Sequence, residues 1–172
     1  IDPNELIKPT IKPDMPINAN VKDFMKLLCD IDYQRPAYHD NWINWCKAVL
    51  AKYPSVLPEY HETESGLINP YVFIDKLFEN LNETDRIVCG NGSACVITFQ
   101  AGKIKQGQRM FTNSGCAAMG YGFPAALGVA VSDNSKRTIC IDGDGSFMMN
   151  IQELATVAHN KLDIKIILIN NN

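Results

Sequence analysis

The fold is decided by Thr138–Asn172, which reads TICIDGDGSFMMNIQELATVAHNKLDIKIILINNN. A short apolar run, Thr138–Ile141, breaks into a glycine-rich turn at residues 142–146. Hydrophobic residues then recur at helical spacing from Phe147 to Ala158, and Ile164–Ile169 is an almost uninterrupted apolar run. Strands that are apolar on both faces are typical of parallel sheets covered by helices. The stretch therefore predicts a strand–turn–helix–strand unit with two parallel strands.

The same alternation of helix and strand reaches back to residue 69. Asn69 and Pro70 predict the start of a helix, because Asn caps helices well and Pro suits their first turn. Arg86–Cys89 predicts another short strand, and a helix rich in small residues is expected to run through Gly120 and on to Gly128. Such alternation indicates the α/β class.

Residues 1–66 differ in composition, because their many prolines predict irregular connections around two helices. The first helix begins after Asn20, and the second carries Trp42 and Trp45 on one face. Neither holds a plausible catalytic set of residues. We interpret residues 1–66 as a helical linker together with the edge of a preceding domain.

Composition excludes several classes of protein. The 172 residues are 46% hydrophobic and 20% charged, with a formal net charge of −3. No apolar stretch approaches the ~18 residues of a membrane span, and scattered Lys and Arg residues give no footprint for nucleic acid. Six cysteines without a C-x-x-C spacing predict reduced, mostly buried thiols in a cytoplasmic protein. The start at Ile1 and the end after an apolar run lead us to expect a piece of a longer polypeptide.

Polar side chains follow the two strands of the first unit. Asp144 comes after the first strand and Asn171 after the second. If the strands are neighbours, their carboxyl ends lie ~5 Å apart, so the two side chains can converge. A carboxylate and a carboxamide oxygen form a hard-oxygen site suited to Mg²⁺ or Ca²⁺.

The glycine-rich turn supplies a complementary site for an anion. Gly143, Gly145 and Ser146 let the backbone approach closely and present N–H groups at the start of a helix. A diphosphate bridged to the protein by a divalent cation would satisfy both halves of the site, and Asp142 is interpreted as a turn or capping residue. Open α/β sheets bind ligands beyond the carboxyl ends of their strands, as this placement requires.

These motifs resemble a known family. Gly143-Asp144-Gly145, followed after 24 residues by Asn170-Asn171, is similar to the signature of thiamine-diphosphate-dependent enzymes. Ile141–Ala155 and Gly115–Gly128 resemble the acetolactate synthase branch closely. The resemblance implies a three-layer α/β/α fold with a mainly parallel sheet, here incomplete. It also implies that residues 67–172 are the cofactor's diphosphate domain, truncated after the Asn-Asn motif, and that residues 1–66 end a central domain.

The resemblance assigns roles by position. Asp144 and Asn171 would ligate Mg²⁺, and the turn residues named above would bind the diphosphate of thiamine diphosphate. Met119 would prop the cofactor, and the carbonyl of Ala117 would receive its aminopyrimidine amino group. Gly92 and Ser93 would touch the diphosphate from a loop that reads Gly-Gln-His in acetolactate synthases but Gly-Ser-Ala here.

The implied activity is that of a lyase or transferase acting on 2-keto acids. The activating glutamate belongs to a separate domain in this family, so no catalytic residue is expected within these 172 and the isolated chain is expected to be inactive. A cytoplasmic homodimer or tetramer with its active site at the subunit interface is implied, without nucleic-acid or membrane partners. Carboligase, decarboxylase and oxidase chemistry stay open, as do a phosphate-binding or regulatory module and a non-catalytic homologue.

Overall fold

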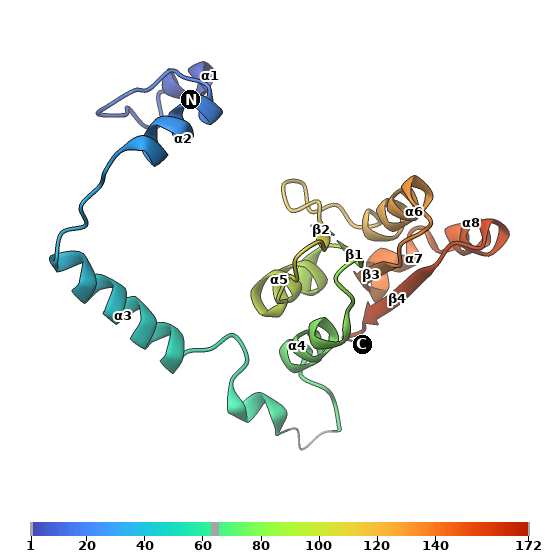
Figure 1. Cartoon of the computed structure of the whole chain (residues 1–172). Coiled ribbons are helices and arrows are strands. Elements are labelled where there is room, and N and C mark those ends of the chain that lie inside the picture. Colours follow the sequence, from blue (N-terminus) through green and yellow to red (C-terminus); the bar gives the residue numbers. More distant parts are fainter. Residues whose placement is uncertain (1, 63–65, 172) are drawn as a thin grey trace. The chain divides into compact units, whose positions relative to one another are not determined.

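The computed structural model describes residues 2–62 and 66–171, which fall into two compact units, Ile1–Ala51 and Lys52–Asn172 (Figure 1). The second unit begins before the predicted domain boundary between residues 66 and 67. That boundary, and the assignment of residues 1–66 to a neighbouring domain, stay predictions.

The first unit is built from three helices, α1 (Pro3–Leu6), α2 (Val21–Asp30) and α3 (Tyr38–Lys52), the last of which ends at the start of the second unit. Asn20 caps α2 as predicted, since its Oδ1 accepts a hydrogen bond of 2.9 Å from the Lys22 N–H. The two predicted helices are confirmed, but no described residue of α1, α2 or α3 is buried. The Trp42 and Trp45 rings stack on each other with centroids 5.0 Å apart.

The second unit contains a sheet of four parallel strands in the order β2-β1-β3-β4. They are β1 (Arg86–Cys89), β2 (Arg109–Phe111), β3 (Thr138–Gly143) and β4 (Ile164–Ile169). The prediction that the two strands of Thr138–Asn172 run parallel is confirmed, and the structure shows that they are neighbours. Strand β2 was not predicted, because three residues with a charge at the first position carry too little periodicity to indicate a strand.

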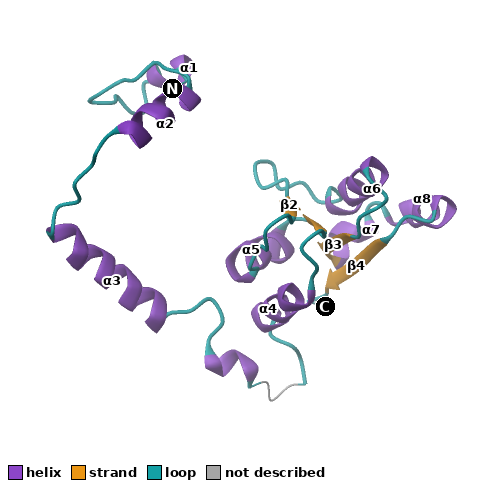
Figure 2. Ribbon diagram, in the orientation of Figure 1, coloured by secondary structure: helices purple, strands orange, loops and turns teal. Residues whose placement is uncertain are grey.

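Helices cover both faces of this sheet and give it three layers (Figure 2). On one face α4 (Pro70–Asn80) and α5 (Gly92–Ala101) pack against side chains that alternate along the strands, Ile87, Cys89, Ile139 and Ile141. On the other face α6 (Gly122–Ser132) and α7 (Asp144–Met148) pack against Val88 and Cys140. Burial on both faces explains why the central strands β1 and β3 carry consecutive apolar residues at 87–89 and 139–141. The predicted α/β class and three-layer arrangement are confirmed.

Two helix predictions need correction, and one helix was not predicted. The helix expected after the glycine-rich turn is divided into α7, η2 (Ile151–Glu153) and α8 (Leu154–Asn160). The break falls at Asn150, whose backbone leaves the helical region with φ −132°. Helix α6 starts at Gly122 rather than before Gly120, because Gly120 has φ +80° and cannot belong to a right-handed helix. Helix α5 was missed, since exposed Val96 and Phe99 hide its buried stripe in the sequence pattern.

The cysteines also differ from expectation. All six are free thiols, but only Cys89 and Cys140 are buried, whereas Cys29 and Cys116 are exposed. Burial raises the pKa of the Cys89 and Cys140 thiols to about 12. The prediction of mostly buried thiols was therefore wrong. No helix within residues 2–62 and 66–171 combines the length and hydropathy of a transmembrane span.

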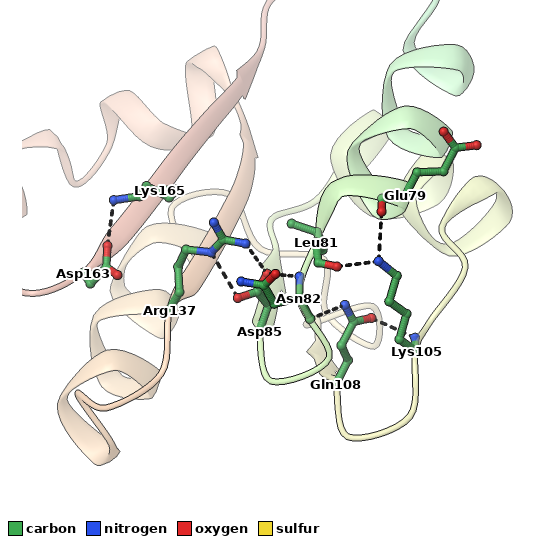
Figure 3. Close-up of polar contacts among 9 residues, drawn as sticks. All are labelled: Glu79, Leu81, Asn82, Asp85, Lys105, Gln108, Arg137, Asp163 and Lys165. Atoms are coloured by element: carbon green, nitrogen blue, oxygen red, sulfur yellow. Dashed lines mark hydrogen bonds and ion pairs between the residues drawn. The ribbon is translucent and has the colours of Figure 1, made fainter.

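The amino ends of the strands are joined by a polar network (Figure 3). Asp85, Gln108 and Arg137 directly precede β1, β2 and β3. The Asp85 carboxylate, which is only 1% exposed, accepts two hydrogen bonds from Arg137 and one of 2.7 Å from the Asn82 N–H. Gln108 Nε2 in turn donates to the Asn82 carbonyl at 2.8 Å. One buried carboxylate therefore connects the starts of neighbouring strands.

We expect Asp85→Asn to lower the free energy of unfolding by about 2 kcal/mol, because it removes one charge of a largely buried ion pair. Urea unfolding would measure the change. Asp163→Asn is the matched control, since Asp163 precedes β4 but forms an exposed ion pair with Lys165, and such pairs contribute under about 1 kcal/mol. Equal effects of the two substitutions would contradict a special role for the Asp85 network.

Two glycines enclose the buried carboxylate of Asp142 at the other end of the sheet. A Cβ at Gly90 would overlap Asp142 Oδ1, and a Cβ at Gly122 would lie 2.6 Å from Asp142 Oδ2. Only glycine at these positions lets the loop after β1 and the start of α6 approach β3 so closely.

Gly122→Ala is expected to destabilise the fold by about 1–3 kcal/mol through this overlap. Gly128→Ala, in the same helix, has no atom within 4 Å of its added Cβ and should stabilise by about 0.5–1 kcal/mol through helix propensity. Thermal unfolding of both variants would measure the two effects. Melting temperatures that shift in the same direction would contradict the prediction that Gly122→Ala destabilises and Gly128→Ala stabilises.

Candidate functional site

A cavity of about 280 Å³ lies at the carboxyl ends of β1, β3 and β4. Its walls come from the last residues of β3 and β4, from the segments that follow the three strands, including the first turns of α5 and α7, and from one residue of the loop before α6. The lining residues are Asn91, Gly92, Ser93, Ala94, Met119, Gly143, Asp144, Gly145, Ser146, Ile169 and Asn171. Eight of the nine predicted site residues are therefore brought together, Ala117 being the exception.

The pairing of β3 with β4 positions the two predicted metal ligands. Gly143 pairs with Ile169, so Asp144 and Asn171 each follow the end of one of two neighbouring parallel strands. Both residues line the cavity. The described residues contain no group of three or more His, Cys, Asp or Glu side chains placed to hold a metal; the pair here combines a carboxylate with a carboxamide. Two such oxygens suit Mg²⁺ in their chemistry.

The glycines of the cavity leave its walls open. A Cβ at Gly92 or at Gly143 would meet no protein atom within 4 Å, so a side chain there would project into free space. Gly92 has φ +58°, a conformation that favours glycine. A ligand with bulky anionic groups fits this arrangement because the backbone itself is accessible.

The backbone N–H groups of the turn are not equivalent. The Gly143 N–H donates to Asp142 Oδ1 at 2.9 Å, so it already has a partner. Gly145 and Ser146 lie in the first turn of α7, where N–H groups have no acceptor within the helix. Because α7 has only five residues, these N–H groups rather than a long helix dipole would attract an anion.

Asp142 lies beneath the cavity and does not line it. Its carboxyl is fully buried, and burial raises its pKa. Its Oδ1 accepts a hydrogen bond from the Gly143 N–H, but Asp142 lies within β3 and the N-cap residue of α7 is Gly143, without a side-chain capping bond. The turn or capping role expected from the sequence is therefore corrected to that of a buried strand residue.

The loop before α6 is held by side chains near the turn. The Gly120 N–H donates to the buried Ser146 Oγ at 2.9 Å, and Asn150 Nδ2 donates to the Gly120 carbonyl at 2.7 Å. The Ser146 hydroxyl therefore supports the loop. Met119, half exposed on this loop, has its methyl group 3.5 Å from where a Cβ of Gly145 would lie.

Ala117 lines a second hollow of about 130 Å³ that shares Asn91 and Gly92 with the first. It is one of two described non-glycine residues with positive φ, at +50°. Its carbonyl accepts a hydrogen bond of 3.1 Å from Asn91 Nδ2. Asn91 was not predicted as a site residue, although its place between two glycines after a strand was a usable signal.

After β1 the chain carries Gly92-Ser93-Ala94 in place of the Gly-Gln-His of the family that it resembles, so the side chains at this point differ. Ser93 is exposed at the rim of the cavity, whereas the Ala94 methyl belongs to the buried core beneath α5. This segment can therefore bind an anion only through the Ser93 hydroxyl and through backbone groups.

Comparison with known proteins agrees with this geometry. The family described as "Thiamine pyrophosphate enzyme, C-terminal TPP binding domain" matches residues 90–172. The chain is 31% identical over 160 residues to the acetolactate synthase isozyme 1 large subunit of Escherichia coli (strain K12), a match covering 93% of this chain and 27% of that protein. It is 34% identical over 178 residues to the acetolactate synthase large subunit of Pyropia yezoensis, covering 99% of this chain and 28% of the relative.

A third relative, the chloroplastic acetolactate synthase 2 of Nicotiana tabacum, is 40% identical over 114 residues, covering 66% of this chain and 17% of the relative. The chain thus spans less than a third of the length of these relatives. Residues 90–172 thus match the C-terminal TPP binding domain of thiamine pyrophosphate enzymes, and the chain is similar to the acetolactate synthase large subunits among them.

Proposed function

We propose that this chain forms the diphosphate-binding part of a thiamine-diphosphate- and Mg²⁺-dependent enzyme that acts on 2-keto acids by acetolactate synthase-like decarboxylation and carboligation. The observation that supports it most strongly is the meeting of Asp144, Asn171 and the glycine-rich turn in one cavity. A cation and an anion would be accepted side by side there, as a Mg²⁺–diphosphate unit requires.

Each site residue has a defined task in this proposal. Asp144 and Asn171 would hold Mg²⁺ through side-chain oxygens. The N–H groups of Gly145 and Ser146 would donate to the diphosphate, Gly143 and Gly92 would leave room for it, and Ser93 would touch it from the rim. Met119 would support the cofactor from the loop opposite Gly145, and the Ala117 carbonyl would accept from its aminopyrimidine in the second hollow.

When bound, thiamine diphosphate supplies the carbon nucleophile and the electron sink for cleavage beside a keto group. The residues of this chain bind and orient it, and no acid or base of the reaction is assigned to them. The activating glutamate would come from another part of the enzyme, in a homodimer or tetramer with the active site at the subunit interface. We place the enzyme in the cytoplasm.

Asp144→Ala in the full-length protein is expected to abolish Mg²⁺-dependent binding of thiamine diphosphate, because the carboxylate is the only charged ligand proposed for the cation. Titration calorimetry with and without Mg²⁺ would measure it. Asp163→Ala is the control, since Asp163 lies before β4 at the opposite edge of the sheet and should leave the affinity unchanged. An unchanged affinity in Asp144→Ala would remove the metal assignment, and displacement of the bound cofactor by ATP would favour a general phosphate-binding module.

The full-length protein is expected to release CO₂ from a 2-keto acid such as pyruvate in the presence of thiamine diphosphate and Mg²⁺, whereas residues 1–172 alone should not. The reason is that these residues would supply binding groups without the activating glutamate. Coupled CO₂ assays on both proteins would decide. Turnover by residues 1–172 alone would disprove the proposal that the activating glutamate lies outside them. A full-length protein that releases CO₂ from no 2-keto acid would favour a non-catalytic homologue.

A further inference from the structure

Asn91 lines both the cavity of about 280 Å³ and the hollow of about 130 Å³ described above. It is the N-cap residue of α5, but its side chain makes no capping hydrogen bond. Instead, its Nδ2 donates to the carbonyl of Ala117, 26 residues further along the chain, at 3.1 Å. The carboxamide is therefore committed to the neighbouring loop rather than to its own helix.

The backbone of Ala117 is held on both sides. Its φ of +50° is unfavourable for a residue with a Cβ. Its N–H donates to the Asn113 carbonyl at 2.6 Å, and its own carbonyl accepts from Asn91. Since a carbonyl oxygen has two lone pairs, the bond from Asn91 leaves one acceptor position for another donor.

The same loop is fixed at its other end. Gly120 is held through its N–H by Ser146 and through its carbonyl by Asn150. Residues 117–120 are thus attached to the turn after β1 at one end and to the α7 region at the other. A segment held in this way is ordered before a ligand arrives, so binding does not have to order it.

We propose that Asn91 is a positioning residue that aims the Ala117 carbonyl at a hydrogen-bond donor on the heteroaromatic ring of the cofactor. The inference rests on the thiamine diphosphate site proposed above and adds to it a side chain whose hydrogen bond serves the ring half, through the Ala117 carbonyl. The role requires the amide donor of Asn91, because a carbonyl oxygen only accepts hydrogen bonds and its side-chain partner must therefore donate.

The test compares two ligands on the full-length protein: thiamine diphosphate with Mg²⁺, and inorganic pyrophosphate with Mg²⁺. Asn91→Ser removes the amide but keeps a favourable N-cap residue for α5. It should weaken thiamine diphosphate about five- to tenfold, the loss of one hydrogen bond, and leave pyrophosphate within about twofold, since pyrophosphate has no ring to reach Ala117. Hydrogen exchange of peptide 113–121 without ligand should be faster in the variant.

Asn80→Ser is the matched control. Asn80 Nδ2 also donates to a backbone carbonyl, that of Lys76 at 2.8 Å, but on the exposed end of α4. It should change neither affinity nor the exchange of peptide 113–121. Asn91→Ala serves as a second deletion, and its affinities should match those of Asn91→Ser.

The outcomes separate the two proposals. A wild-type protein that binds neither ligand would overturn the proposed function and this role of Asn91 with it. A wild-type protein that binds both, combined with an Asn91→Ser variant of unchanged thiamine diphosphate affinity, would overturn the Asn91 inference alone. Equal weakening of both ligands would also overturn it, because it would indicate a general structural effect.

Discussion

The parallel pairing of β1, β3 and β4 is the constraint on which the candidate site depends. Because the strands run in one direction, their carboxyl ends share one edge of the sheet, and three loops distant in sequence line the same cavity. The pairing of Gly143 with Ile169 sets how far Asp144 and Asn171 extend past that edge. A slip of one residue in β4 would turn its side chains to the opposite faces of the sheet and move Asn171 out of register.

The two edges of the sheet serve different purposes. At the amino ends, the buried Asp85 carboxylate is paired with Arg137 and tied to the backbone of Asn82, so its hydrogen-bonding capacity is used within the protein. At the carboxyl ends, glycines leave backbone groups accessible and Asp144 faces a cavity. Satisfied polar groups stabilise the first edge, and polar groups left open to a ligand equip the second.

The cavity also explains how a chain with a formal net charge of −3 can be suited to an anionic ligand. The described residues that line it include no Lys or Arg. Neutralisation of a diphosphate would therefore come from the cation at Asp144 and Asn171 and from N–H groups of the turn. Such binding depends on exact backbone placement, which is why the contacts that hold the loops, from Ser146, Asn150 and Asn91, matter as much as the residues that face the ligand.

The sequence by itself determined the α/β class, the bounds of β1 and β4, the cap of α4 by Asn69 and the convergence of Asp144 with Asn171. These follow from local patterns: unbroken apolar runs, a capping residue before Pro70, and polar residues placed directly after strands. Only the tertiary structure decided the rest. Strand β2 forms through its pairing with β1. Helix α6 starts at Gly122 because Gly120, which is hydrogen-bonded to Ser146 and Asn150, has a positive φ. The Asn91 side chain is linked to the loop before α6 by its hydrogen bond to the Ala117 carbonyl, 26 residues further along the chain. Each of these features depends on contacts between segments distant in the chain, and local periodicity carries no information about such contacts.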